Sequence, residues 1–169
     1  MSRHVVVIIM GSKGDLDFAI PIGRMLERLN VHYEYRVASA HKTPNELLRI
    51  LEEYERTEQA IVYITVAGLS NALSGVVDAQ TKFPVIACPP YSEKFAGNDI
   101  LSSLRMPSGV SPLVVLNPES AGLAAAKILA LEEPDLAKRI IEGQLAKRRN
   151  VNVADGKVKG RKVAELTGG

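Results

Sequence analysis

The stretch His4–Met10 reads HVVVIIM and carries the strongest structural signal in this 169-residue chain. Its residues are almost all β-branched, and no polar residues alternate with them. Such a run is typical of a strand buried on both faces of a parallel sheet. The next five residues, Gly11-Ser12-Lys13-Gly14-Asp15, contain two glycines that permit a tight turn, and Asp15 can cap a following helix. We therefore predict the first strand and the first β–α turn of an α/β domain.

Four further apolar runs follow, each separated from the next by a helical pattern, and the first three strand ends are evenly spaced along the chain. We predict strands at Tyr33–Ala38, Ala60–Val66, Phe83–Ala87 and Leu113–Leu116. We predict helices at Leu16–Leu29 and Asn45–Arg56, a small-residue helix ending near Asp78, a short helix with loops at Lys94–Leu104, an Ala-rich helix at Pro118–Leu131, and a last helix from Pro134 to about Arg149. This alternation predicts a three-layer α/β/α sandwich with a parallel sheet and right-handed crossovers.

We expect a single domain over residues 1–150 and a C-terminal arm over residues 151–169. Hydrophobic residues make up 46% of the chain, which is enough for one substantial core. The tail Asn150–Gly169 has four glycines, mixed charge and few apolar residues, which predicts an extended or mobile arm.

Composition excludes several classes of protein. The net charge is only +2, so nucleic-acid binding is not implied, and no apolar run approaches the roughly 18 residues that span a membrane. No signal peptide is recognisable at the N-terminus. The one cysteine, Cys88, cannot form an internal disulfide, which favours a reducing, cytoplasmic compartment. It ends a buried strand without a neighbouring acid or base, so we interpret it as a core residue.

The loop after the second predicted strand reads Ser39-Ala40-His41-Lys42-Thr43-Pro44. It offers a hydroxyl, an imidazole and an ammonium group, and Pro44 suits the first turn of the next helix. Ligands of open parallel sheets bind beyond the carboxyl ends of the strands. Because Ser12, Ser39–Lys42 and Gly68–Asn71 all follow strands, they should converge on one edge of the sheet. Their convergence indicates a site for a phosphate-bearing ligand.

Common nucleotide motifs are missing. Neither G-x-x-x-x-G-K-[ST] nor G-x-G-x-x-G occurs, which disfavours ATP and NAD. Two interpretations of Gly11–Asp15 remain open. The segment is a plain turn, or it is part of a mononucleotide site in which Ser12 binds phosphate and Asp15 binds ribose hydroxyls. His4 and His32 precede strands whereas His41 follows one, so the three cannot cluster within a subunit, and we expect no metal site.

Three segments together resemble the PurE family, whose members place the carboxyl group on aminoimidazole ribonucleotide (AIR) in purine synthesis. The segments are Met10–Asp15, Ser39–Pro44 and Ala67-Gly68 with the small residues after it, and the resemblance extends from about Val5 to about Leu131. It implies a flavodoxin-like sheet, a homo-octamer with active sites shared between subunits, and no metal, biotin, ATP or other cofactor. The C4 carbon of AIR is an enamine carbon and already nucleophilic, which accounts for the absence of a cofactor.

The family has two branches. Class I mutases, which rearrange N5-carboxyaminoimidazole ribonucleotide, carry a second histidine in a Gly-Gly-Ala-Ala-His-Leu-Pro-Gly loop, and Gly68–Gly75 here has none. Ser70–Gly75, Cys88–Pro90 and Ser102–Gly109 resemble class II, the carboxylases that convert AIR and carbon dioxide directly to carboxyaminoimidazole ribonucleotide (CAIR). Class II loops usually read Ala-Gly-Arg-Ser-Asn, and Leu69 replaces that arginine. A class I mutase, or a nucleotide-binding paralogue without carboxylase activity, remains an alternative.

The resemblance also implies a role for each site residue. His41, the only histidine at the ligand edge, would be the catalytic acid and base. Substrate-binding roles fall to Ser12 and Lys42 on phosphate with Ser39 assisting, Asp15 on ribose, and Gly68, Ser70 and Asn71 around carbon dioxide. The smooth Ala-rich face of Pro118–Leu131 favours close helix packing, and we expect the Pro134–Arg149 helix or the tail to cross to a neighbouring subunit.

Overall fold

The protein, described here by a computed structural model over residues 3–90 and 92–166, is built on five parallel strands. The strands are β1 (His4–Met10), β2 (Tyr33–Val37), β3 (Ala60–Val66), β4 (Val85–Ala87) and β5 (Leu113–Val114). Their order in the sheet is β2-β1-β3-β4-β5. The chain first winds to one side of β1 and then to the other, which is the flavodoxin-like order. The predicted fold class is confirmed.

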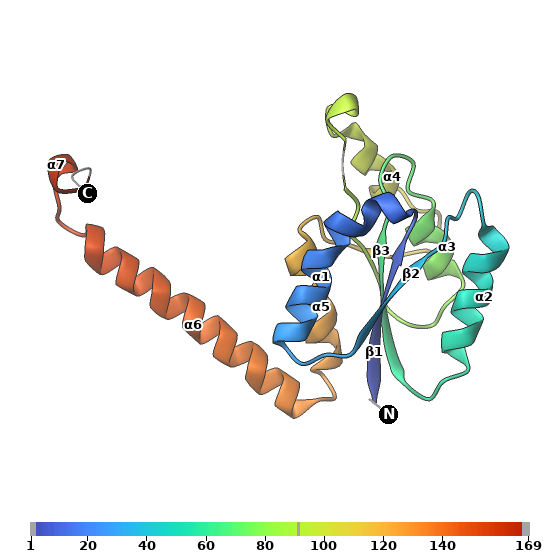
Figure 1. Ribbon diagram of the computed structural model, residues 1–169, viewed down its shortest axis with the longest axis horizontal. Helices are drawn as coiled ribbons and strands as arrows, with labels where there is room; N and C mark the ends of the chain where they lie inside the picture. Colours follow the sequence, from blue (N-terminus) through green and yellow to red (C-terminus); the bar gives the residue numbers. More distant parts are fainter. Residues whose placement is uncertain (1–2, 91, 167–169) are drawn as a thin grey trace.

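Helices cover both faces of the sheet (Figure 1). They are α1 (Leu16–Arg28), α2 (Pro44–Glu55), α3 (Leu73–Ala79), α4 (Leu101–Leu104), α5 (Pro118–Leu129), α6 (Pro134–Val158) and α7 (Val163–Leu166), with short 3-10 turns η1 (Lys13–Asp15), η2 (Glu93–Phe95) and η3 (Asn98–Ile100). Helices α1 and α5 pack on one face of the sheet, and α2 and α3 pack on the other. Of the described helices, none combines the length and the apolar character needed to cross a bilayer.

Strand β1 is buried on both faces, as its unbroken apolar sequence predicts. Val6 and Ile8 pack toward α1 and α5, whereas Val7 and Ile9 pack toward α2. Side chains of a strand alternate between its faces, so a one-residue slip would exchange the two cores. Full burial of each such side chain contributes about 1.5–3 kcal/mol, so a slip would be costly. This cost keeps β1 in one register, and the end of the strand therefore lies at a defined level of the sheet.

The Ala-rich face of α5 packs inside the domain, against α1. Ala121 and Ala125 are fully buried, and a Cβ added at Gly122 would lie 2.8 Å from the carbonyl oxygen of Ile22. The backbones of the two helices therefore come close together. The predicted close helix packing of this face is confirmed, and its partner is α1 of the same chain.

Helix α6 extends beyond its predicted end and leaves the body of the domain (Figure 1). The sequence predicted an end near Arg149 and an extended tail, yet the helix continues to Val158. A glycine inside a helix costs only about 1 kcal/mol, so Gly156 does not end it. The helix ends before Gly160, whose φ is +75°, and the short helix α7 follows. The predicted helix end near Arg149 was wrong, because residues 150–158 continue the helix, and the last three residues of the expected arm lie outside the described part.

Three strand boundaries also differ from the predictions, and the smallest difference is in β2, which ends at Val37 instead of Ala38. Strand β4 begins at Val85 instead of Phe83, because Pro84 has no N–H to donate to the ladder. Strand β5 ends at Val114, although the N–H of Val115 still donates to the carbonyl of Ala87 at 3.0 Å. The ends of β1 and β3, which face the candidate site, lie where they were predicted, and the end of β2 differs by one residue.

Candidate active site

Three strands end at the same level of the sheet. Met10, the last residue of β1, is in register with Val37 of β2 and with Val66 of β3. The N–H of Ala38 donates to the carbonyl of Met10, and the N–H of Gly11 donates to the carbonyl of Val66, both at 2.9 Å. Neighbouring strands are about 5 Å apart, so the loops after β2 and β3 lie roughly 10 Å apart with the β1 loop between them. The predicted convergence of the three loops is confirmed.

The loop after β1 is closed by its own carboxylate. One carboxylate oxygen of Asp15 accepts hydrogen bonds from the N–H of Ser12 at 2.8 Å and from its hydroxyl at 3.0 Å. A Cβ at Gly11 would lie 3.2 Å from the Cβ of Ala67, so this loop approaches the one after β3 closely. Ser12 is exposed at the edge of the sheet, with its hydroxyl oriented by Asp15.

The loop after β2 is held by hydrogen bonds among its own residues. The N–H of Ser39 donates to the hydroxyl of Thr43 at 2.9 Å, and the N–H of Lys42 donates to the hydroxyl of Ser39 at 3.2 Å. His41 and Lys42 are exposed at the turn, and Pro44 begins α2 as predicted. Thr43 was not among the predicted site residues, although a threonine directly before a helix proline is a common capping signal.

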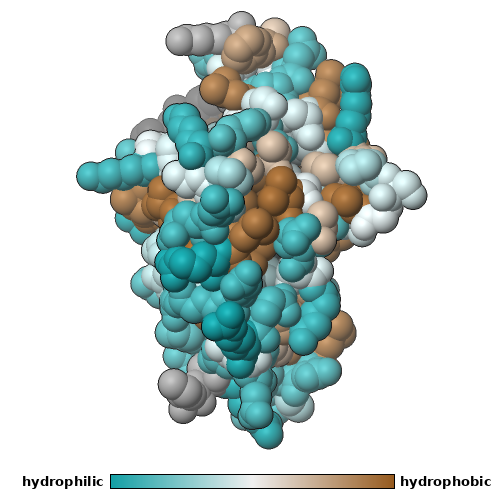
Figure 2. All heavy atoms as spheres, turned by 90° about the vertical axis from the view of Figure 1, so that its right-hand side faces the viewer, coloured by the Kyte–Doolittle hydropathy of each residue, from teal (hydrophilic) through white to brown (hydrophobic). Residues whose placement is uncertain are grey.

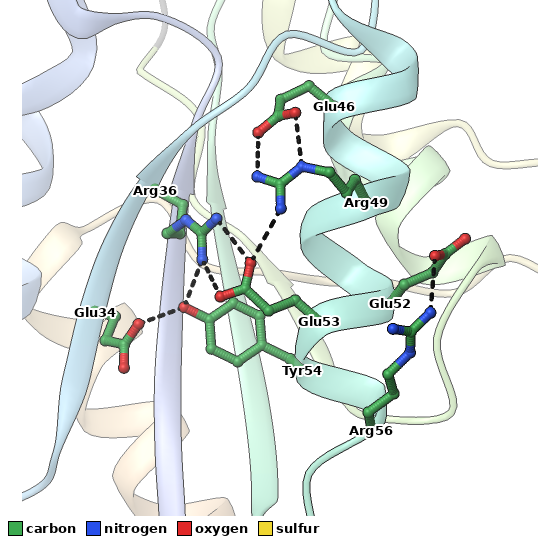
Figure 3. A network of polar contacts seen from close by, with 8 residues as sticks. All are labelled: Glu34, Arg36, Glu46, Arg49, Glu52, Glu53, Tyr54 and Arg56. Carbon is green, nitrogen blue, oxygen red and sulfur yellow. Dashed lines mark hydrogen bonds and ion pairs between the residues drawn. The ribbon is translucent and has the colours of Figure 1, made fainter.

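A network of charged and phenolic groups ties β2 to α2 beside this loop (Figure 3). Arg36 on β2 donates to both carboxylate oxygens of Glu53 on α2, each at 3.2 Å, and to the hydroxyl of Tyr54 at 3.2 Å. The hydrogen bond to Glu53 raises the pKa of Arg36. Burial, with a 2.5 Å hydrogen bond to Glu34, raises the pKa of Tyr54 to about 12. The two elements that flank His41 are thereby fixed against each other.

The loop after β3 combines close packing with an unusual backbone. A Cβ at Gly68 would lie 2.8 Å from the carbonyl oxygen of Pro90, so no side chain fits there without a shift of the backbone. Leu69 has φ +58°, in the left-handed region that non-glycine residues rarely adopt, and its side chain is 58% exposed. Ser70 is exposed as well. This loop therefore presents Leu69 and Ser70 at the edge of the sheet.

Asn71 differs from the other predicted site residues because it is buried, with 3% of its surface exposed. Its side-chain amide donates to the hydroxyl of Ser103 at 3.0 Å and accepts from the N–H of Ser74 at 3.3 Å. Its own N–H donates to the hydroxyl of Ser102 at 3.0 Å. Neither Ser102 nor Ser103 was among the predicted site residues. A serine pair between two leucines in a short helix was the available signal.

Residues outside the three loops lie where the sequence predicted. His4 starts β1 near Glu133, and His32 precedes β2, so both are at the opposite end of the sheet from His41. Cys88 is fully buried, and burial raises the pKa of its thiol to about 12. The thiol is therefore protonated at neutral pH and unreactive, which confirms its interpretation as a core residue.

A hollow of about 1060 Å³ opens at the amino ends of β1 and β3. Its lining includes one arginine, Arg3, and three carboxylates, those of Glu58, Glu132 and Glu133. An acidic lining disfavours a phosphate, and open parallel sheets bind ligands at their other end. The candidate active site is therefore the edge formed by the three loops.

Known proteins resemble the chain over most of its length. The sequence profile of the AIR carboxylase family matches residues 5–150. A phosphoribosylaminoimidazole carboxylase of Archaeoglobus fulgidus is 53% identical over 149 residues, which are 88% of this chain and 82% of the relative. The crystal structure of Treponema denticola PurE has a TM-score of 0.91 at 44% identity and covers 93% of this chain and 99% of that one. The chain belongs to the AIR carboxylase family.

Proposed function

We propose that the chain is a class II AIR carboxylase, a carboxy-lyase that converts AIR and carbon dioxide to CAIR without ATP. The observation that carries this proposal is the meeting of the three loops at one edge, with His41 as the histidine there. Gly68–Gly75, where class I mutases have a second histidine, contains none. The names of the carboxylase relatives support the same activity.

Substrate binding falls to the loops after β1 and β2. Lys42 and the hydroxyl of Ser12 bind the phosphate of AIR, and Ser39 assists by shaping the turn around Lys42. The amino end of α2 adds a favourable field for the phosphate. Asp15 binds the ribose hydroxyls through the carboxylate oxygen that Ser12 leaves available.

His41 manages the proton at C4. The enamine carbon C4 of AIR attacks the carbon of carbon dioxide and forms the new C–C bond, while one C=O electron pair becomes the carboxylate charge. C4 then carries both a hydrogen and the carboxylate. His41 accepts that proton, and the electrons of the C–H bond restore the aromatic imidazole. In the reverse direction, His41 returns the proton to C4, and the C–C bond then breaks to release carbon dioxide.

The loop after β3 forms the carbon dioxide pocket. Gly68 lets the loop pack closely against Pro90, Ser70 and the N–H groups of the exposed backbone meet the developing carboxylate, and Asn71 holds the loop from within. Holding carbon dioxide against C4 and excluding water supply much of the rate enhancement. Leu69 brings an apolar side chain to this pocket where an arginine is usual.

The same proposal includes a homo-octamer located in the cytoplasm. His41 and Lys42 are exposed in the single chain, so water exclusion requires another surface to cover them. An apolar patch lies on the face that carries α2 and α3 (Figure 2), and Leu48 of α2 is among the exposed leucines. Helix α6 extends from the domain and exposes Ile141 and Leu145, which suits a crossing to a neighbour. Light scattering at micromolar concentration should give eight chain masses, and a monomeric mass would contradict this assembly.

One assay tests the function. The protein is mixed with AIR and bicarbonate, without ATP, and formation of CAIR is followed. We expect product to form at a rate proportional to enzyme and to dissolved carbon dioxide. A protein that binds AIR without forming CAIR would be the non-carboxylating paralogue, and the replacement of arginine by Leu69 is the feature that favours that alternative.

A further inference from the structure

A buried polar cluster lies beneath the loop after β3. Among the described residues, the buried polar side chains are those of Thr65, Asn71, Ser74 and Ser103. Two of these four side chains are joined directly, because the amide of Asn71 donates to the hydroxyl of Ser103, and the amide oxygen of Asn71 also accepts from the backbone N–H of Ser74. Buried polar groups destabilise a fold unless they are paired, so this cluster specifies a particular arrangement of the loop and of α4.

Helix α4 is polar on the side that faces the protein and apolar on the side that faces outward. Leu101 and Leu104 are 40% and 57% exposed, whereas Ser103 is 1% exposed and Ser102 is half-buried. A surface helix normally shows the opposite arrangement. The inner side of α4 therefore serves hydrogen bonding to the loop after β3, which lies about thirty positions earlier in the chain.

The hydroxyl of Ser102 contacts the backbone of this loop at two points. It accepts from the N–H of Asn71 at 3.0 Å, and it lies 3.0 Å from the carbonyl oxygen of Leu69. It also lies 2.8 Å from the carbonyl oxygen of Asp99 in its own helical turn. A hydroxyl has one hydrogen, so the two carbonyls share it, whereas the bond from Asn71 is not shared. One side chain thus contacts the backbone on both sides of Ser70.

Leu69 needs such support because its backbone is left-handed, at φ +58°. That conformation brings Cβ close to the following carbonyl, which makes it unfavourable for a residue other than glycine unless the surrounding structure enforces it. The Ser102 hydroxyl contacts the carbonyl of Leu69 and accepts from the N–H of Asn71, so it holds the backbone that directly follows this strained residue. Without these contacts, the loop would relax toward an ordinary right-handed or extended backbone.

We propose that Ser102 is a positioning residue that holds Leu69 and Ser70 in the conformation used for carboxylation. The proposal rests on the proposed function, because it assigns this loop to the carbon dioxide pocket. Ser102 acts through the loop backbone and does not touch substrate. Its loss should affect the chemical step and leave the phosphate contacts on the other two loops intact.

Kinetics of Ser102→Ala test this role against Ser108→Ala, a nearby exposed control. We expect kcat to fall about tenfold, the size expected for the loss of one net hydrogen bond, while KM for AIR changes by less than about twofold. Ser102→Thr retains the hydroxyl and should recover most of the rate. An equal rise in KM, or no recovery by threonine, would mean general damage and would overturn the proposal.

A double substitution tests the strained turn itself. Glycine adopts a left-handed backbone without penalty. The double variant with Leu69→Gly and Ser102→Ala should therefore have a kcat at least threefold higher than Ser102→Ala alone. Leu69→Gly alone provides the reference for the double-mutant cycle. Strict additivity of the two substitutions would overturn the link between Ser102 and Leu69.

Amide hydrogen exchange separates this proposal from the proposed function. The N–H of Asn71 should exchange at least tenfold faster in Ser102→Ala than in the wild type, whether or not the protein is a carboxylase. Unchanged exchange would overturn the claim that Ser102 holds the loop after β3. Faster exchange with unchanged kcat would overturn its catalytic relevance. A wild type that makes no CAIR would overturn the proposed function, and the positioning role in carboxylation with it.

Discussion

The loops after β2 and β3 are neighbours in space but are held in opposite ways. The hydrogen bonds of the β2 loop join residues three or four positions apart, from Ser39 to Thr43. The β3 loop is held by α4, and its bonds join residues 31 and 32 positions apart. A locally closed loop keeps its shape when an exposed side chain is replaced. Substitutions in the β2 loop should therefore report chemistry, whereas substitutions around the β3 loop should also report shape.

His41→Asn should give the largest effect. Asparagine retains polarity and approximate size but cannot carry the C4 proton, and the local bonds of the loop do not involve the imidazole. We expect kcat to fall by about 10²–10⁴ with KM for AIR little changed. Steady-state kinetics with AIR and bicarbonate measure both. A raised KM with normal kcat would identify His41 as a binding residue.

Lys42→Ala should act on binding instead. The phosphate is present in both substrate and transition state, so this contact contributes uniform binding. Loss of one charge-assisted contact of about 1.5–3 kcal/mol raises KM by roughly 10- to 150-fold. Lys42→Arg, which keeps the charge, is the matched control and should recover part of the affinity. A fall in kcat at unchanged KM would show that the two adjacent residues have exchanged roles.

Asn71→Ala should lower stability more than the matched substitution in the other loop, Thr43→Ala. Removing the buried amide leaves Ser103 and the N–H of Ser74 without their partner, which costs about 1–3 kcal/mol. Thr43→Ala removes only exposed local bonds that water can replace, and should cost less than about 1 kcal/mol. Urea unfolding measures both. Equal losses would remove the distinction between a locally held and a distantly held loop.

Alkaline pH should weaken the network that frames the β2 loop, with the smallest effect of the four. The pKa of Tyr54 is raised to about 12 in the folded protein, against about 10 when unfolded. Its stabilising contribution is complete below pH 10 and is lost as pH rises through about 12. We expect the unfolding free energy to fall over this interval, and less steeply in Tyr54→Phe. The variant for comparison is Tyr33→Phe, because the hydrogen bond to Glu27 also raises the pKa of Tyr33 to about 12.

The sequence predicted the parts of the site that depend on local patterns. The unbroken apolar residues of β1 and the turn residues after β1 and β2 placed Ser12, His41 and Lys42 at one edge, which the strand register confirms. The buried state of Asn71 could not be read locally, because it depends on Ser103, which is distant in the chain. The length of α6 was missed for a different reason. Glycine weakens a helix without ending it, so the glycine-rich composition of the tail led to a predicted helix end that came too early.

The central claim is that this chain carboxylates AIR with free carbon dioxide. The direct test supplies N5-carboxyaminoimidazole ribonucleotide labelled with ¹³C in its carboxyl group, in excess unlabelled bicarbonate, and measures the label in CAIR. A carboxylase uses AIR released by spontaneous breakdown, so the account predicts CAIR that is largely unlabelled and forms no faster than that breakdown. Rapid formation of CAIR that retains the label would identify a class I mutase and contradict the account.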